Sequence, residues 1–258
     1  MNMRESKLNG IVFVFVLMIA WELAARLHWV NPLIVPPLSR IFASFGTLVA
    51  SGDIPLQILA SMKRAVVGYI LAAAVFIPLG IFMGLFDYCH RALEVAIEML
   101  RPIPPPAVIP VALLFFGLED EMKIFVIFFS CAWPILLNTL DGVKNIDRLL
   151  MNTARTFGLS RVRTIWQVVL PACSPHIMTG LRVSLPITLI LVVISEMVGS
   201  TDGIGYFILD SQRRFKIPQM YGGMLALAVL GYALNLLFNL AHRSLLSWHW
   251  GMLRKEGR

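Results

Sequence analysis

Residues 152–171 read NTARTFGLSRVRTIWQVVLP and form the most polar stretch in the middle of the chain. This stretch carries Arg155, Arg161 and Arg163, yet the segments on both sides of it are long and apolar. Of the 258 residues, 58% are hydrophobic and 14% are charged, whereas a soluble domain has roughly 25% charged residues. A bilayer core requires roughly 20 apolar residues for each helical span. The composition therefore predicts an all-α, polytopic membrane protein.

Working outward from this stretch, the apolar segments predict membrane spans at about 10–27, 65–86, 91–117, 121–141, 176–198 and 221–241. The third span is expected to be broken, because its RPIPPPAVIP sequence concentrates residues that interrupt helices. The second contains Gly80-x-x-x-Gly84, a spacing that lets two helices approach closely. A short amphipathic piece is expected near 38–50. Since nothing indicates a separate soluble domain, residues 1–258 are predicted to form one transmembrane domain.

The net charge of +7 could suggest nucleic acid, but in a membrane protein cations gather in cytoplasmic loops and near anionic headgroups. Counting Lys and Arg predicts both termini inside, as a multi-pass protein of the bacterial inner membrane. The predicted inner cations are Arg4, Lys7, Arg91, Lys144, Arg148, Arg155, Arg161, Arg163, Arg243, Arg254, Lys255 and Arg258. The predicted outer cations are Arg40, Lys63, Arg64, Lys123, Arg213, Arg214 and Lys216, with the last three in an outer loop.

The polar segment, 142–171 as a whole, is predicted to form a helix, a glycine turn and a second helix. Apolar residues recur at helical spacing in the first half, at Ile146, Leu149, Leu150, Ala154 and Phe157. Gly158 can adopt the positive φ that ends a helix, and Ser160 can cap the next. The second apolar face comprises Val162, Ile165, Trp166 and Val169. Pro171 is expected to break this helix before the next span.

Three interpretations of this segment compete. It could be an amphipathic connector that rests on lipid headgroups. It could be a helix-turn-helix that reads DNA, but that motif needs a small helical core for which the adjoining spans leave no room. It could also present an amphipathic helix to a groove on a soluble partner.

The segment resembles the cytoplasmic signature of binding-protein-dependent ABC transporter permeases: Glu-Ala-Ala, three residues, Gly, nine residues, then Ile-x-Leu-Pro. Here Asn152-Thr153-Ala154 occupies the first part, Gly158 the glycine, and Val168-Val169-Leu170-Pro171 the end. Asn152 replaces the usual Glu and Thr153 the usual Ala, so an ion pair from that Glu to the ATPase is not available. The resemblance extends over nearly the whole chain and is closest to the nitrate, sulfonate and taurine branch. It is carried by LIVPPLSRIF (33–42), RPIPPPAVIPVALLFFGLED (101–120), SPHIMTGLRVSLPITLILVVISEM (174–197) and GIGYFI (203–208).

The resemblance implies the type I ABC importer permease fold, in a homodimer that forms the translocation pathway. Its implied partners are two ATPase subunits and a periplasmic or lipid-anchored binding protein, within membrane lipid and without nucleic acid. The residues implied to couple transport to ATP hydrolysis are Asn152, Thr153, Ala154, Arg155, Phe157, Gly158, Arg161, Leu170 and Pro171. The chain lacks a G-x-x-x-x-G-K-[ST] loop, so ATP and Mg²⁺ are expected on the partner ATPase and not here. The chain is therefore expected to be a transport subunit and not an enzyme.

Ionisable residues at membrane depth are functional candidates. Glu98 and Arg101 lie three apart on the third span and can pair with each other. Alternatively, Arg101 and the irregular backbone at Pro104 and Pro105 line the translocation pathway. On the fifth span, Arg182 and Glu196 are further candidates for the translocation pathway. Glu196 also has a simpler alternative: it pairs with a neighbouring basic residue or caps the loop that follows.

Other chemistries have less support. Cys89, Cys131 and Cys173 are widely spaced and have no partner set for a structural metal, so neither a disulfide framework nor a metal is expected. A secondary transporter driven by an ion gradient is the main alternative function, but no inverted repeat is apparent. An intramembrane enzyme would need partners for Ser130, Cys131 or Ser195. The substrate stays open among nitrate, alkane sulfonates, taurine, bicarbonate and a pyrimidine vitamin precursor, with Arg101 and Arg182 favouring an anion.

Overall fold

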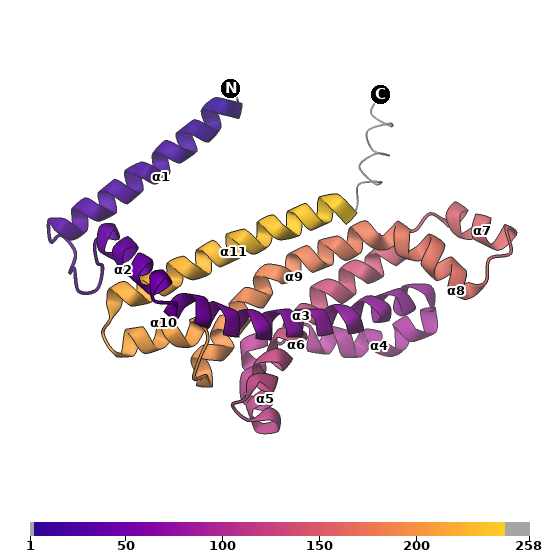
Figure 1. Ribbon diagram of the computed structural model, residues 1–258. Coiled ribbons are helices and arrows are strands. Elements are labelled where there is room, and N and C mark those ends of the chain that lie inside the picture. Colours follow the sequence, from indigo (N-terminus) through magenta and orange to yellow (C-terminus); the bar gives the residue numbers. More distant parts are fainter. Residues whose placement is uncertain (1–2, 246–258) are drawn as a thin grey trace. The chain divides into compact units, whose positions relative to one another are not determined.

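The structure, a computed structural model, describes residues 3–245, and every regular element in that range is a helix (Figure 1). In chain order the elements are α1 (Met3–Arg26), α2 (Leu38–Ala50), α3 (Asp53–Leu85), α4 (Asp87–Leu100), the 3₁₀-helix η1 (Pro105–Val108), α5 (Ile109–Phe116), α6 (Asp120–Lys144), α7 (Arg148–Thr156), α8 (Arg161–Thr164), the π-helical turn η2 (Ile165–Val169), α9 (Leu170–Gly199), α10 (Ile204–Arg213) and α11 (Ile217–Leu245). The predicted all-α class is confirmed.

The chain divides into two compact units, one formed by 1–60 with 201–230 and the other by 61–200 with 231–258. In the second unit the most extensive helix pair is α6 with α9. The hydrophobic cluster beside this pair draws on α3, α5, α6 and α9, with Ala72, Ile109, Ile127, Ile135 and Val192 among its buried members. This unit also carries the polar segment between α6 and α9, which contains α7 and α8.

Small residues on α3 allow it to lie directly against α6. A Cβ added at Gly80 would come within 2.8 Å of Thr139 Cβ, and one added at Gly84 within 2.6 Å of Val143 Cβ. These distances are shorter than real Cβ contacts, so the backbones approach closely because no side chain intervenes. The close approach predicted for the Gly80-x-x-x-Gly84 spacing is therefore confirmed, and it operates within one chain.

The first unit is held by polar contacts between α1 and the segment that precedes and begins α2. The indole Nε1 of Trp21 donates to the carbonyl of Pro36 at 3.1 Å, and the Ser39 backbone N–H donates to Glu22 Oε2 at 3.1 Å. Trp21 also meets the ring of Tyr221 edge-on, with centroids 6.0 Å apart. These contacts fix the proline-containing connection at 27–37 against α1.

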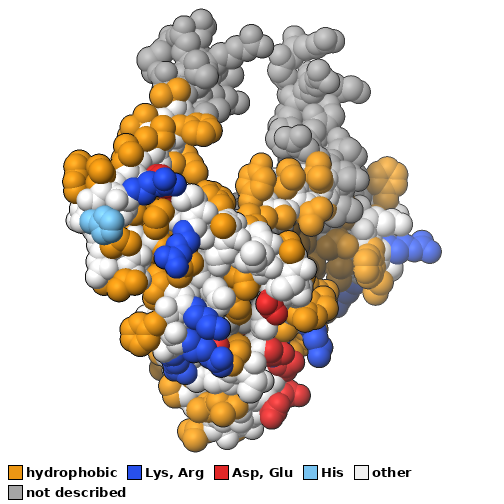
Figure 2. Space-filling model, turned by 60° about the vertical axis from the view of Figure 1, so that its left-hand side comes forward, with side chains coloured by type: hydrophobic (Ala, Val, Ile, Leu, Met, Phe, Trp, Pro, Cys, Tyr) orange, Lys and Arg blue, Asp and Glu red, His pale blue; other side chains and the backbone are white. Residues whose placement is uncertain are grey.

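Four helical stretches in 3–245 are long and apolar enough to cross a membrane: Asp53–Leu85, Asp120–Lys144, Arg161–Gly199 and Ile217–His242. The pair Asp87–Leu100 and Pro105–Phe116, bent by 92°, makes a fifth if it is counted as one broken span. The predicted break in the third span is confirmed. The first predicted span coincides with α1, which is not among the four, and stays a prediction. Figure 2 shows apolar side chains over much of one face, as lipid contact requires.

Two details differ from expectation. α3 begins at Asp53, well before the predicted 65, and residues 204–213 form α10 where a loop was expected. Arg213, Arg214 and Lys216 are exposed at the end of α10, as expected of a solvated set. Arg214 Nε lies 3.0 Å from Asp210 Oδ2 one turn earlier, an ion pair that a helix provides and a loop does not. Of the predicted inner cations, Arg254, Lys255 and Arg258 lie outside the described residues.

Candidate functional site

The polar segment between α6 and α9 begins with a capped helix. Asp147 is the N-cap of α7, and its Oδ1 accepts a hydrogen bond from the Leu149 N–H at 2.8 Å. At the other end, the Gly158 N–H donates to the Arg155 carbonyl at 3.0 Å and the Leu159 N–H to the Ala154 carbonyl at 3.1 Å. This pair of bonds, with Gly158 at φ 67°, is a Schellman motif. The predicted helix and glycine turn are confirmed.

The second helix starts as predicted and continues further than predicted. Ser160 is the N-cap of α8, and its Oγ accepts from the Arg163 N–H at 3.4 Å. Pro171 was expected to end this helix, and that prediction is wrong: residues 161–199 form one helical run. Proline lacks an N–H and clashes with the preceding turn of a regular α-helix. The π-helical turn at Ile165–Val169 lies directly before Pro171 and widens that turn, so the helix passes through.

Several apolar side chains of this segment are exposed, whereas Val169 is buried. Phe157 is 79% exposed and Trp166 is 67% exposed, and Leu149, Leu150 and Val162 are exposed as well. Only Ala154 is buried on α7. We call Leu149, Leu150, Phe157, Val162 and Trp166 the exposed apolar set. An apolar surface of this kind at the end of a helical bundle is typical of a contact with another molecule.

The polar candidates of the segment are also accessible. Asn152, Thr153, Arg155 and Arg161 are exposed, Leu170 is half-buried, and Pro171 is exposed. The side chain of Thr153 donates to the Leu149 carbonyl one turn earlier at 2.8 Å. The structure thus places these residues on one continuous helix–turn–helix, together with the exposed apolar set.

The candidates on the broken span lie at a sharp bend. Arg101 follows the last residue of α4, and the chain turns by 92° into η1 and α5. Glu98, Arg101 and Pro104 are exposed and Pro105 is half-buried. Among residues 3–245 there is no ion pair between Glu98 and Arg101, so the predicted pairing does not form, although the two residues are three apart.

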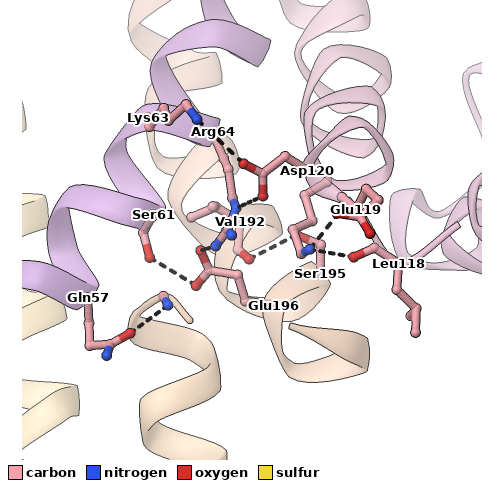
Figure 3. A network of polar contacts seen from close by, with 12 residues as sticks. Gln57, Ser61, Lys63, Arg64, Leu118, Glu119, Asp120, Val192, Ser195 and Glu196 are labelled. Carbon is pink, nitrogen blue, oxygen red and sulfur yellow. Dashed lines mark hydrogen bonds and ion pairs between the residues drawn. The ribbon is translucent and has the colours of Figure 1, made fainter. Parts of the chain in front are cut away.

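Glu196 lies in a buried polar network near the end of α9 (Figure 3). Its Oε1 lies 2.9 Å from Arg64 Nη1, and its Oε2 accepts a hydrogen bond from Ser61 Oγ at 2.9 Å. Arg64 Nε reaches Asp120 Oδ1 at 2.6 Å, so one guanidinium joins carboxylates from α9 and the start of α6. The side chains of Glu196 and Arg64 are 0% and 5% exposed. The interpretation of Glu196 as the partner of a neighbouring basic residue is confirmed.

Lys123 completes the polar region at this end of α6. Its Nζ donates to the carbonyl oxygens of Leu118 and Glu119 at 2.8 and 3.2 Å, although the residue is almost fully buried. From the sequence, Arg64 and Lys123 were predicted only as outer cations. The sequence does show two cations beside apolar segments. The partners of Arg64 are distant along the chain, however, so local spacing could not identify the network.

The pathway candidates do not form one cluster. Arg182 is exposed on α9, and at 1.5 Å per residue it lies about 20 Å along the helix axis from Glu196. Arg101 lies at the bend after α4. Two exposed cations on separate helices can face an aqueous path, whereas Glu196 is enclosed by Ser61 and Arg64.

Comparison with known proteins identifies the family. The sequence profile of the family described as binding-protein-dependent transport system inner membrane component matches residues 76–247. An aliphatic sulfonates transport permease protein, SsuC of Bacillus subtilis (strain 168), is 30% identical over 95% of this chain and 89% of its own length. The nitrate import permease protein NrtB of Leptolyngbya laminosa is 37% identical over 70% of this chain and 65% of its own length.

A solved structure with the same fold is an inward-facing form of the MetNI methionine ABC transporter. The match has a TM-score of 0.61 at 17% identity and covers 73% of this chain and 94% of the matched chain. At this identity the match establishes the fold, and it confirms the expected importer permease architecture. Together with the family profile and the relatives, these findings place the chain among the inner-membrane permeases of binding-protein-dependent ABC transporters, in the nitrate, sulfonate and taurine branch.

Proposed function

We propose that this permease forms, as a homodimer, the translocation pathway of an ATP-driven importer for a small anionic solute that a separate binding protein delivers. Two partner ATPase subunits bind ATP and Mg²⁺ and dock on the segment formed by α7, Gly158 and α8. The observation that carries the proposal is the exposed apolar set on this segment, in a chain that belongs to the ABC permease family. Family membership also favours this function over transport driven by an ion gradient.

The docking proposal rests on the shape and chemistry of the segment. α7 is capped at both ends, so its conformation is defined before any partner binds. An amphipathic helix whose apolar side is exposed fits a groove on a partner. Asn152 is exposed and offers hydrogen bonds without a charge. The apolar contacts of Phe157 and its neighbours therefore provide most of the docking free energy in this proposal.

The anion proposal rests on Arg101 and Arg182, which are exposed on the broken span and on α9. Both relatives described above are named for transport of anions, nitrate and sulfonates. Nitrate, alkane sulfonates and taurine are therefore the proposed solute class. Selection among them is assigned to the binding protein.

We place both termini and the α7–α8 segment on the cytoplasmic side. The exposed or half-buried cations of that segment include Arg148, Arg155, Arg161 and Arg163. Of the cations assigned to the opposite side, Arg64 and Lys123 are buried in the polar network and are not loop charges. Removing them from the count strengthens the charge asymmetry that sets orientation.

The test compares two phenylalanines of equal exposure, Phe157 on the α7–α8 segment and Phe115 on α5, at 79% and 80%. Full burial of a Phe side chain contributes about 1.5–3 kcal/mol. Phe157→Ala is therefore expected to weaken binding of the coexpressed ATPase subunit by roughly 10- to 100-fold. Phe115→Ala should leave that affinity unchanged.

Affinity is measured by titrating the purified ATPase subunit onto the full chain in detergent, with ATP hydrolysis of the complex as a second readout. If both substitutions weaken ATPase binding equally, the loss of any exposed aromatic side chain impairs the protein in general, and Phe157 has no specific role in docking. Unchanged affinity in Phe157→Ala would contradict docking on this segment.

A further inference from the structure

A cavity of about 400 Å³ lies between the end of α3 and the α7–α8 segment. Its lining residues are Leu85, Phe86, Met151, Arg155, Leu159, Arg161, Thr164, Ile165 and Val169. The polar lining groups are two arginines and a threonine, and no Asp or Glu is among them. The cavity lining thus combines two cations with apolar side chains.

A second cavity of about 350 Å³ lies further along α3 and is lined only by apolar residues: Ile77, Pro78, Ile81, Phe82, Ile165, Trp166 and Leu170. Ile165 lines both cavities, at the first position of the π-helical turn. The two cavities therefore adjoin, and the second follows a helix that is apolar enough to span a membrane.

We infer that these adjoining cavities bind one anionic phospholipid, with its phosphate headgroup at Arg155 and Arg161 and an acyl chain along Ile77, Ile81 and Trp166. A guanidinium binds phosphate oxygens in a bidentate manner, and basic pockets beside membrane helices take anionic headgroups. Trp166 lines the apolar cavity, follows the shared Ile165 in the chain and is 67% exposed, which suits an indole near the boundary between headgroups and acyl chains. A free phosphate would satisfy the arginines but would leave the apolar cavity unoccupied.

The site joins the α7–α8 segment to the bundle. Leu85 is the last residue of α3 and Phe86 follows it, whereas Met151 and Arg155 belong to α7. A lipid in this position contacts both, so it strengthens the attachment of α7 to α3. Arg155, Arg161 and Trp166 also belong to the segment proposed to dock the ATPase. The inference is therefore tested on the isolated chain with lipid, where its failure is distinguishable from failure of the proposed docking.

The test uses the full chain in nanodiscs without any ATPase. Phosphatidylglycerol and phosphatidylcholine with brominated acyl chains are compared as quenchers of tryptophan fluorescence, and the Trp166 contribution is obtained by difference from Trp166→Phe. Each arginine at an anionic headgroup strengthens binding by about fivefold. The Trp166 contribution is therefore expected to show a preference for phosphatidylglycerol of roughly 25-fold in apparent affinity.

The matched variants remove equal charge from the same segment. Arg155→Gln with Arg161→Gln should abolish the preference, whereas Arg148→Gln with Arg163→Gln, which do not line the cavity, should retain most of it. Equal loss in both pairs would overturn the site in favour of general surface charge. Equal quenching by the two lipids in the wild type would also overturn it, and that comparison needs no variant. Displacement of the preference by millimolar inorganic phosphate or an alkane sulfonate would assign the cavity to a small anion instead.

Discussion

Arg64 offers a direct test of how the polar network around Glu196 stabilises the bundle. Its guanidinium contacts Glu196 from α9 and Asp120 from the start of α6, so three helices meet at one side chain. Arg64→Met keeps much of the side-chain volume and removes the charge and the donors. The buried Glu196 carboxylate then loses its guanidinium contact and keeps the hydrogen bond from Ser61.

The magnitude follows from burial. Removing one partner of a buried ion pair costs about 3–5 kcal/mol, whereas an exposed pair contributes at most about 1 kcal/mol. Arg64 and Glu196 are 5% and 0% exposed, so Arg64→Met belongs to the first class. For a chain of this size, 1 kcal/mol changes Tm by about 2–4 °C. The expected loss is of the order of 10 °C.

Arg214→Met is the matched control. Arg214 pairs with Asp210 at 3.0 Å, close to the 2.9 Å of Arg64 and Glu196, but its side chain is 59% exposed and that of Asp210 is 31% exposed. Its Tm should fall by no more than a few degrees. The double variant Arg64→Met with Glu196→Gln removes the buried charge along with its partner and should recover part of the lost stability.

Tm is measured by thermal unfolding of the full chain in one detergent, using a thiol-reactive fluorophore. Equal losses in Arg64→Met and Arg214→Met would refute the argument from burial. A double variant less stable than Arg64→Met alone would show that the Glu196 carboxylate stabilises the bundle through other groups.

Three further predictions concern glycines and cysteines. Gly158→Ala places a Cβ on a residue at φ 67°, in otherwise open space, and should cost about 1–2 kcal/mol within the turn. ATP hydrolysis of the assembled complex should fall as a result. Gly52→Ala, at φ 84° and equally open, should be strained in the same way but should leave this ATP hydrolysis unchanged. Gly84→Ala should lower Tm because its Cβ would meet Val143, whereas Gly46→Ala, within α2 and with no atom inside 4 Å, should leave Tm unchanged or raise it slightly. In maleimide labelling of the folded chain, half-buried Cys89 should react first, and fully buried Cys131 and Cys173 only on unfolding; early labelling of Cys131 would contradict the packing of α6 on α9.

The sequence was most informative where structure is set by neighbouring residues. The amphipathic piece predicted near 38–50 is α2, Leu38–Ala50, and the helix end at Gly158 and the cap at Ser160 were both predicted correctly. Each of these depends on contacts within a few positions along the chain. Local chemistry therefore determined them.

The errors arose where distant residues decide the outcome. Lys63 and Arg64 were counted as outer cations just before a second span predicted to start at 65. In the structure α3 continues through them, because Arg64 is paired with Asp120 and Glu196, far along the chain. Pro171 suggested a helix end, but the π-helical turn before it accommodates the ring. The roles of the coupling and pathway residues stay predictions, since they depend on partners outside this chain.

The unbroken helical run from Arg161 to Gly199 forms one long rod, which links α8 to the polar network around Glu196. At 1.5 Å per residue, Arg161 lies about 50 Å from Glu196 along this rod. Glu196 is bound by Ser61 and Arg64 of α3, and Arg64 also binds Asp120 of α6, so this end of the rod is anchored in the polar network. A tilt of about 5° around it displaces Arg161 by about 5 Å. Conversely, a displacement of about 5 Å at Arg161 requires only a small rotation of the helix at Glu196, because the distance between the two residues is long.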